Sequence, residues 1–262
     1  MERLYTGTAK NASPIVTGCA FPVAAEAMRH SLTKDLVAYW RFERPWTGLP
    51  YQVRDSVGNS HAQPINGANT VAGGKIGRGV SLDGVDQYLR TPLKNCAVDR
   101  LNLHGHDITL AAWFKVNELP SVSNEYKSIY GYGRSLTGGG WYTLYLSKFD
   151  TVHFRVDSHY MDGVTTFVVG TWYMILGCFH VSTQRMEVYL NENLEKSKDV
   201  ATWGTTPTGL SRAFLGTYEL SPGNSENFNG VFDELAIWKR TLSAAERSYY
   251  YNNGKGRRLL GW

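Results

Sequence analysis

Residues 230–256, GVFDELAIWKRTLSAAERSYYYNNGKG, place a strand signal directly before a helix signal. The segment 231–238 is short and rich in apolar and β-branched residues, which predicts a strand. Ser243 and Glu246 have the spacing of a capping box, which predicts the start of one short helix. Gly254 adopts a positive φ without steric cost, so we expect the helix to end near it.

The composition favours an all-β protein. Of the 262 residues, 42% are hydrophobic and 19% are charged, so a packed core is expected and disorder is not. Aromatic residues reach 13% and there are 27 glycines, a combination that suits many short strands joined by tight turns. The formal charge is only +4 and the basic residues are scattered, which gives no indication of nucleic-acid binding.

Segments of strand length and composition recur along the chain. Turn signals separate them at intervals of about 8–12 residues, the spacing of a sandwich, and no β-α-β alternation appears. A tight turn at Asp83-Gly84 predicts a hairpin of two short strands within residues 74–89. The other predicted strands are residues 36–43, 108–116, 127–132, 141–147, 151–157, 164–168, 172–181, 185–190 and 213–215.

Four motifs occur in order: AYWRFE at residues 38–43, DSVGN at 55–59, GKIGRGVSLDGVDQYL at 74–89 and FDELAIWKRTLSAAE at 232–246. In this order they resemble the laminin-G-like, or concanavalin A-like, jelly-roll domains, and the resemblance spans residues 36–256. It implies an all-β, antiparallel jelly-roll β-sandwich with one short C-terminal helix. These motifs mostly build the scaffold, so the resemblance specifies the fold more than the ligand.

The first 34 residues differ from the rest because they show no sustained hydrophobic period. Residues 24–30, AAEAMRH, are predicted to form one short helical turn. We interpret residues 1–34 as an arm that docks on a partner protein or a neighbouring subunit, with a loose tail as the alternative. Residues 35–262 are interpreted as one laminin-G-like jelly-roll domain. No run approaches the ~18 apolar residues of a membrane span, and two prolines interrupt the stretch that a signal peptide would need.

The three cysteines, Cys19, Cys96 and Cys178, are too few and too widely spaced for a disulfide framework or a zinc site. Cys178 lies in the apolar run TWYMILGCFHV and is expected to be a buried thiol. Nothing in the sequence decides whether Cys19 and Cys96 pair.

Oxygen-bearing side chains in separate parts of the chain predict a candidate cation site. Asp55 and Asn59 lie in the DSVGN loop, Asp233 begins the last strand, and the first and last strands of a jelly roll are commonly close, which brings Glu43 near. Calcium takes about 6–8 oxygen ligands, and members of the resembled family often carry a structural calcium in such a region. The alternative is that Asp55 and Asn59 only cap their own turn. Asp233 and Glu234 alternate across a strand, so both are not expected to face one ion.

A second candidate site is a sugar-binding face on the hairpin of residues 141–157. Aromatic rings bind the apolar faces of sugars, while neighbouring polar groups fix the hydroxyls. If residues 148–150 form the loop, Tyr145 lies beside His153, and Trp141 and Arg155 share the same outward face.

Tyr132 and Arg134 are predicted to form the adjoining rim of this face, across the run of glycines at residues 138–140. Several alternatives remain open. A register slip of one residue would bury Trp141, and a second sheet or the N-terminal arm packed on the face would cover it. Large aromatic residues in sandwiches also lie more often in the core.

Motifs of catalysis are missing from the sequence. Glycosidases of the resembled fold carry two carboxylates in a Glu-x-Asp-x-x-Glu run, whereas in FDELAIW the acids are adjacent and followed by apolar residues. There is no Gly-x-Ser-x-Gly elbow, and the glycine-rich segment 131–140 lacks the end of a phosphate-binding loop. We therefore expect a protein that is not an enzyme.

Two functional hypotheses follow. The first is a non-catalytic, lectin-like module that binds glycans or polysaccharides on a surface, with calcium as the one expected cofactor. The second is a structural component of an assembly, such as a virion decoration or appendage protein, anchored by residues 1–34 and without a sugar ligand. Both hypotheses place the protein outside the cell or on a virion surface.

Overall fold

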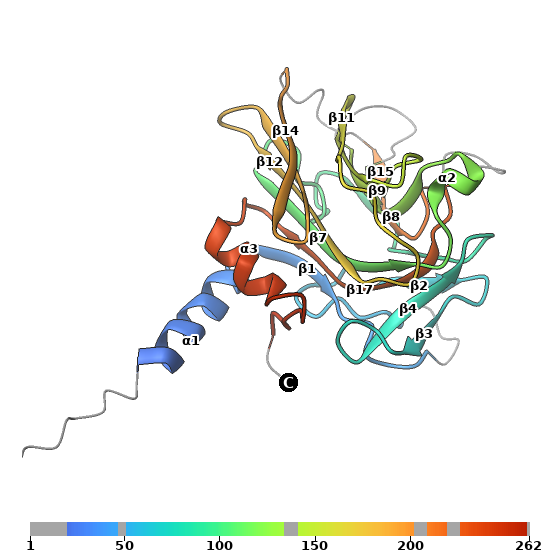
Figure 1. The fold of residues 1–262 in the computed structure, drawn as a ribbon, viewed down its shortest axis with the longest axis horizontal. Helices are drawn as coiled ribbons and strands as arrows, with labels where there is room; N and C mark the ends of the chain where they lie inside the picture. Colours follow the sequence, from blue (N-terminus) through green and yellow to red (C-terminus); the bar gives the residue numbers. More distant parts are fainter. Residues whose placement is uncertain (1–19, 47–50, 134–140, 202–208, 219–225, 261–262) are drawn as a thin grey trace, which may run out of the picture.

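Two antiparallel sheets form the body of the protein in the computed structural model (Figure 1). The structure describes residues 20–46, 51–133, 141–201, 209–218 and 226–260. The eight-stranded sheet has the order β14-β13-β12-β7-β17-β4-β3, with β1 also paired to β17. Its strands are β1 (Leu36–Trp40), β3 (Asn69–Ala72), β4 (Arg78–Asp83), β7 (Ile108–Val116), β12 (Tyr173–His180), β13 (Arg185–Leu190), β14 (Asn193–Asp199) and β17 (Asn229–Trp238).

The seven-stranded sheet has the order β11-β10-β9-β8-β16-β5-β2. Its strands are β2 (Gln63–Ile65), β5 (Tyr88–Arg90), β8 (Lys127–Tyr132), β9 (Tyr142–Leu146), β10 (Val152–Val156), β11 (His159–Asp162) and β16 (Ala213–Leu215). A two-stranded sheet joins β6 (Lys94–Asn95) to β15 (Leu210–Ser211). The helices are α1 (Ala20–Thr33), α2 (Pro120–Ser123) and α3 (Ala244–Tyr251). The predicted all-β sandwich with a short C-terminal helix is confirmed.

Both faces of the central strands of the eight-stranded sheet are buried. In β12, Ile175 and Phe179 lie in the core between the two sheets, whereas Met174 and Leu176 point to a second hydrophobic cluster on the other side. This alternation follows from the two-residue period of a strand, because consecutive side chains point to opposite faces. A third layer must therefore cover the outer face.

α3 and the C-terminal segment supply that third layer. Tyr250 of α3 is fully buried and lies edge-on to Trp238, with ring centroids 5.8 Å apart. Tyr251 stacks on Trp113 of β7 at 5.6 Å, and Leu259 is buried in the same cluster. Each large aromatic ring removes about 150–250 Å² of surface from water, so this layer contributes substantially to stability.

Residues 74–89 do not form the predicted hairpin. β4 pairs with β3 and β17 in the eight-stranded sheet, whereas β5 pairs with β2 and β16 in the other. The tight turn itself is present, since Gly84 has φ 75° and the Asp83 carboxylate accepts the N–H of Val85 at 2.9 Å. The turn carries the chain from one sheet to the other, and its sequence alone does not reveal which strands pair on either side.

The predicted strand at residues 164–168 is also wrong. The strand in this region is β11, and the chain after it is irregular because the Glu195 carboxylate accepts the N–H groups of Val164 and Thr165 at 2.9 and 2.7 Å. Val164 and Val168 are exposed, and only Phe167 of this segment enters the core. The valines of this segment predicted a strand. In the structure the segment is a loop, held by the hydrogen bonds to Glu195.

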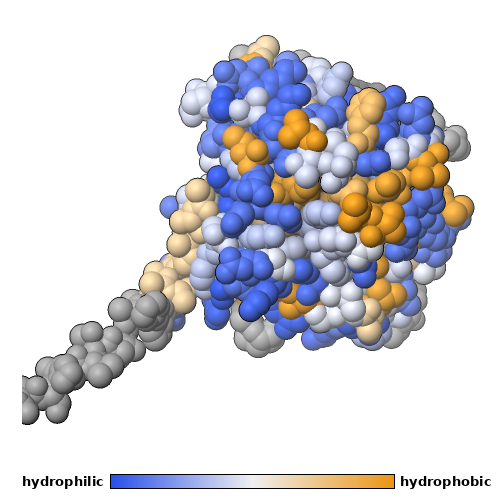
Figure 2. Space-filling view, in the orientation of Figure 1, coloured by the Kyte–Doolittle hydropathy of each residue, from blue (hydrophilic) through white to orange (hydrophobic). Residues whose placement is uncertain are grey.

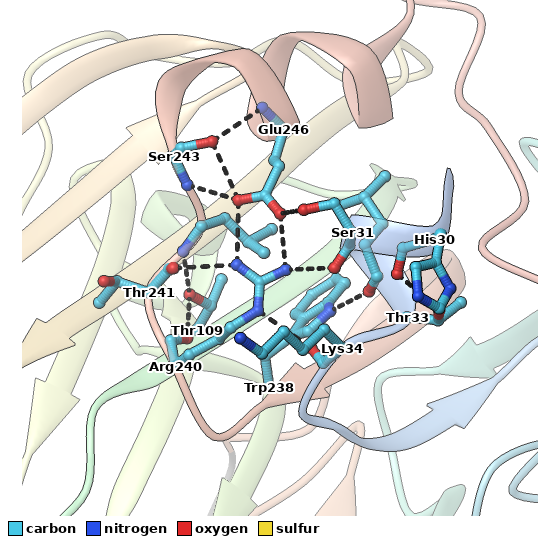
Figure 3. Close-up of polar contacts among 12 residues, drawn as sticks. His30, Ser31, Thr33, Lys34, Thr109, Trp238, Arg240, Thr241, Ser243 and Glu246 are labelled. Atoms are coloured by element: carbon cyan, nitrogen blue, oxygen red, sulfur yellow. Dashed lines mark hydrogen bonds and ion pairs between the residues drawn. The ribbon is translucent and has the colours of Figure 1, made fainter. Parts of the chain in front are cut away.

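Glu246 connects the end of β17, α3 and α1 (Figure 3). The capping box predicted for α3 is present: Ser243 Oγ accepts the N–H of Glu246, and the Glu246 carboxylate accepts the N–H of Ser243 at 2.9 Å. Arg240 donates two hydrogen bonds to the same carboxylate, at 2.7 and 2.9 Å, and Ser31 donates a third at 2.6 Å. The helix ends at Tyr251 and is capped by Asn252, with φ 52°, two residues before the predicted Gly254.

α1 is longer than the single turn predicted at residues 24–30. Its last turn is fixed to the body, because Leu32 is buried and its carbonyl accepts the indole N–H of Trp238 at 2.7 Å. The preceding part extends away from the sandwich, and residues 24–27 are exposed (Figures 1 and 2). Among the helices that the structure describes, none is long and apolar enough to span a membrane.

Two buried cysteines are free thiols. Cys178 is buried, as predicted, and belongs to the hydrophobic cluster on the outer face of the eight-stranded sheet, which we call the outer cluster; Cys96 is also buried and unbridged. Cys19 lies outside the described residues.

Replacing Glu246 with Gln tests the junction in Figure 3. Burial alone would raise the pKa of Glu246, but hydrogen bonds from Arg240, Ser31 and Ser243 lower it to about 2. A lowered acid pKa stabilises the fold above the ordinary value near 4.5 and loses that contribution as the pH falls towards 2. We expect Glu246→Gln to lower the free energy of unfolding by about 2–3 kcal/mol at neutral pH, measured by chemical denaturation.

The matched control is Glu26→Gln, because Glu26 is exposed on α1. It should change the free energy by less than about 0.5 kcal/mol. Equal stabilities of the two variants at neutral pH would contradict the role given to Glu246.

Candidate functional site

The hairpin of β9 and β10 has the register that the sequence predicts. His153 lies opposite Tyr145, and Arg155 lies opposite Thr143. The N–H of Asp157 donates to the carbonyl of Trp141 at 2.7 Å, which places those two residues side by side at the open end of the hairpin. The alternate residues Leu144, Phe154 and Val156 lie in the core, so the predicted side chains point outward from the seven-stranded sheet.

A continuous row of aromatic rings crosses this outward face. We call it the ring row and define it as Trp141, Tyr218, Tyr145, His153 and Tyr160. Successive ring centroids along the row are 6.5, 6.0, 5.7 and 5.7 Å apart. These separations are typical of favourable aromatic pairs, so the row is a packed layer and not a set of independent side chains.

The middle of the ring row is less accessible than the sequence suggested. Tyr145 and His153 are each only 4% exposed. Tyr126 packs edge-on against both of them, at 6.4 and 4.9 Å, and the Tyr145 hydroxyl donates to Glu226 at 3.3 Å. These two predicted residues therefore form the floor of the face.

The first end of the ring row is polar and half-buried. The Arg155 guanidinium lies 4.5 Å from the centre of the Trp141 ring, and its Nε donates to the carbonyl of Asp157 at 2.7 Å. The indole N–H of Trp141 donates to the Asp157 carboxylate at 2.7 Å. The cation–π contact and both hydrogen bonds fix Trp141 and Arg155 in one orientation.

The other end of the ring row is the more exposed one. Tyr160 of β11 is 54% exposed and stacks on His153. His153 Nδ1 and the Asp162 carboxylate are 2.8 Å apart. Burial alone would raise the pKa of Asp162, but the hydrogen bond and charge of His153 outweigh it and hold that pKa below its ordinary value.

Tyr132 is a correction to the predicted rim. It lies opposite Tyr142 in the sheet and has the core-facing parity, so its side chain is fully buried between the sheets. A register shift between Ser128 and Tyr130 sets this parity, and such a bulge leaves no clear signal in the sequence. The predicted Arg134 lies outside the described residues.

Three tyrosines of this face were missed. Tyr160 belongs to β11, whose sequence HYMD is too polar to predict a strand. Tyr126 precedes β8 and Tyr218 follows β16, and neither position carries a ligand-binding signal. Tyr218 reaches the face because Gly131 leaves room for it: a Cβ on Gly131 would lie 2.4 Å from the Tyr218 ring. Gly131, a glycine within a predicted strand, was the one sequence signal that another group packs closely at this position.

The four residues predicted to hold calcium are engaged elsewhere. The Asp55 carboxylate accepts three backbone N–H groups, from Tyr39, Val57 and Ser60, at 3.0–3.2 Å. It therefore caps its own turn, as the alternative reading proposed, and also fastens that turn to β1. Asn59 instead accepts a hydrogen bond from Lys94 at 3.1 Å.

Glu43 and Asp233 also have other partners. Glu43 forms an ion pair with Arg258 at 2.5 Å, and Asp233 accepts the N–H groups of Ile76 and Glu234 at 2.9 and 2.8 Å. β1 and β17 do pair, as the prediction requires. However, within the described ranges no group of three or more His, Cys, Asp or Glu side chains is placed to hold a metal ion.

A β-bulge in β17 places Asp233 and Glu234 on the same side of the sheet, contrary to the expected alternation. Glu234 has φ 50°, and the pairing with β7 shifts between Asp233 and Ala236. The Tyr39 hydroxyl donates to the Glu234 carboxylate beneath the C-terminal layer. Burial raises the pKa of each carboxyl to about 8.

Comparison with known families gives one match. A family model described as the concanavalin A-like lectin/glucanases superfamily matches residues 83–246. No curated protein sequence matches the chain.

Solved structures share the fold. Domain 4 of AbnA, a GH43 extracellular arabinanase from Geobacillus stearothermophilus in complex with arabinotriose, matches with 20% identity and a TM-score of 0.59, over 82% of this chain and 97% of that domain. A Trypanosoma rangeli sialidase matches with 16% identity and a TM-score of 0.63, over 86% of this chain. The binding domain of Paraclostridial Mosquitocidal Protein 1 matches with 16% identity and a TM-score of 0.62, over 85% of this chain. The chain spans only 34% of the sialidase and 53% of the mosquitocidal-protein structure.

The buried acids of β17 make stability depend on pH. A raised acid pKa stabilises the fold fully below the unfolded value near 4.5, and this contribution is lost as the pH rises through about 8. Glu234→Gln removes one titrating group and keeps an oxygen that accepts the Tyr39 hydrogen bond. We expect the decline of unfolding free energy between about pH 5 and 8 to become shallower by about 1 kcal/mol per pH unit.

Chemical denaturation at several pH values measures this slope. Asp233 still titrates in the variant, so a residual slope is expected. Identical slopes for the variant and the unaltered protein would show that Glu234 is already ionised in the folded state.

Proposed function

The chain belongs to the concanavalin A-like lectin/glucanase superfamily, and we propose that it is a non-catalytic carbohydrate-binding module. The proposed ligand is a glycan or polysaccharide on a surface, and the proposed location is outside the cell. The observation that carries this function is the ring row, with exposed Tyr160 at one end and the fixed pair of Trp141 and Arg155 at the other.

The ring row has the chemistry that a saccharide requires. Aromatic faces bury the C–H surface of a sugar ring, and Arg155, Asp157 and Asp162 offer hydrogen-bond donors and acceptors beside them. The buried middle of the row, Tyr218, Tyr145 and His153, holds exposed Tyr160 and half-buried Trp141 in place. A rigid platform loses little conformational entropy on binding.

A binding role is favoured over catalysis by the placement of the acids. A glycosidase needs a carboxylic acid of raised pKa facing its ligand. Asp233 and Glu234 have raised pKa values but are fully buried on the eight-stranded sheet, beneath the C-terminal layer. Asp162, which does lie beside the ring row, has a lowered pKa.

The arabinanase domain supports the same proposal. Its structure contains arabinotriose, and this chain covers nearly all of that domain. The arabinanase is extracellular, which agrees with the proposed location. The identity of 20% is too low to transfer a sugar specificity, so the ligand of this protein must be found by screening.

Replacing Tyr160 with Ala tests the glycan face. The full chain is screened against a broad polysaccharide panel, and affinity for the best ligand is measured by titration calorimetry. We expect Tyr160→Ala and Trp141→Ala each to weaken binding at least about tenfold, equivalent to about 1.4 kcal/mol, because each removes one end of the ring row.

Phe149→Ala is the matched control, since Phe149 is 60% exposed at the turn end of the same hairpin. Binding should be unchanged in this variant. The panel is repeated with calcium and with a chelator, which tests the predicted calcium cofactor in the same experiment. No saturable binding by the folded protein to any polysaccharide would rule out the lectin-like function.

α1 favours a second candidate function, that of a structural component displayed on an assembly such as a virion. Its residues 24–27 are exposed on a helix that leaves the sandwich, while Ser31 and Leu32 are fastened to β17 and α3. The Tyr249 hydroxyl of α3 also donates to the carbonyl of Ala25 at 3.0 Å, so α1 contacts the body along its side as well as at its base. A protruding helix with exposed side chains suits an anchoring arm. In this candidate the sandwich is a building block without a sugar ligand.

Truncation before His30 distinguishes the two functions. Ser31 and Leu32 remain, so we expect the melting temperature to change by less than about 2 °C. Self-association or docking, measured by light scattering and by co-sedimentation with the assembly, should be lost if the arm is the anchor. Unchanged association would remove the assembly role and leave glycan binding unaffected.

A further inference from the structure

A basic pocket lies beside the end of β1, formed by the chain that follows β1 and by the C-terminal segment. Its volume is about 550 Å³. The pocket is lined by Arg41, Phe42, Glu43, Arg44, Trp46, Gln52, Val53, Arg54, Asp55, Ser56, Arg258 and Leu260. It shares no residue with the ring row, which lies on the other sheet.

The pocket carries more positive than negative charge. Four guanidinium groups face two carboxylates, and both carboxylates are already engaged. Glu43 is paired with Arg258, and the Asp55 oxygens accept three backbone N–H groups. The carboxylates of the pocket therefore neutralise only part of the positive charge of its arginines.

Arg44 and Arg54 are the groups that remain available. Both are exposed, and neither forms an ion pair in the part of the chain that the structure describes. Arg41 is half-buried behind them, and burial together with the nearby Arg258 lowers its pKa. An anion bound here would relieve the repulsion between these guanidinium groups.

The remaining wall of the pocket suits a sugar ring. Trp46 is half-buried and packs against the core, so its ring position is fixed. Gln52 adds an amide to the lining. An aromatic ring, an amide and guanidinium forks together match a saccharide that carries an oxyanion.

We propose that this pocket is a second binding site, which takes the carboxylate or sulfate group of an acidic saccharide. Arg44 and Arg54 hold the oxyanion, and Trp46 packs against the sugar ring. The site goes beyond the glycan face proposed above and does not depend on it. A protein with both sites would bind saccharides at two separate places.

Titration calorimetry on the full chain tests the pocket. The probes are an oligogalacturonate, a sulfated oligosaccharide, a neutral oligosaccharide of the same length and inorganic phosphate. We expect saturable binding of one or both acidic probes. Arg44→Gln and Arg54→Gln should each weaken it about tenfold, because each removes one charge-assisted contact. Both side chains are exposed, so neither variant should unfold.

Three controls make the outcome decisive. Lys239→Gln removes one exposed positive charge away from the pocket and should leave affinity unchanged. Tyr160→Ala should also leave it unchanged, and a loss in that variant instead would assign the acidic saccharide to the ring row and overturn the proposal. Equal affinity for inorganic phosphate and the acidic saccharides would overturn the role of Trp46. Binding that is unaffected in both arginine variants would overturn the site itself.

Discussion

The fold depends on the burial of both faces of β17. This strand pairs with β1, β4 and β7, and its residues alternate between the core of the sandwich and the outer cluster. A strand with two apolar faces cannot remain at a surface, so the outer face requires a covering layer. α3 and the C-terminal segment supply it, and Arg240 and Glu246 fasten that layer to α1. The Asp233–Glu234 bulge lies beneath this layer, and its buried carboxylates accept hydrogen bonds from Tyr39 of β1 and from the N–H of Ile76.

Local rules predicted the parts of the fold that local interactions determine. The capping box at Ser243 and the register of the β9–β10 hairpin involve residues close in sequence, and both are confirmed. The turn at Asp83-Gly84 was also correct as a turn, but whether its flanking strands pair is decided by β3, β17, β2 and β16. Which sheet a strand joins depends on strands from the whole domain, so a short sequence pattern does not predict it.

The candidate site was predictable to the same extent. Tyr145, His153 and Arg155 were placed on the correct face because strand parity specifies it. Their burial was not predicted, because Tyr126, Tyr160 and Tyr218 come from three other segments of the chain. The cation prediction named turn capping by Asp55 as its alternative, which the structure shows, but it did not foresee that Arg258 pairs with Glu43 and that Lys94 donates to Asn59. Side chains with several possible partners are the hardest to assign from sequence.

The edge strand β14 has a consequence for how copies of this protein meet. Its sequence NLEKSKD is polar and largely exposed, with Lys196 and Lys198 at the border of the eight-stranded sheet. An unpaired strand edge is a template for pairing with another chain, and lysines on that edge oppose it because pairing would remove their charged groups from water. Concentrated copies displayed side by side are thus protected from sheet-to-sheet fusion along β14. The polar β14 edge therefore opposes aggregation when many copies of the protein are crowded together.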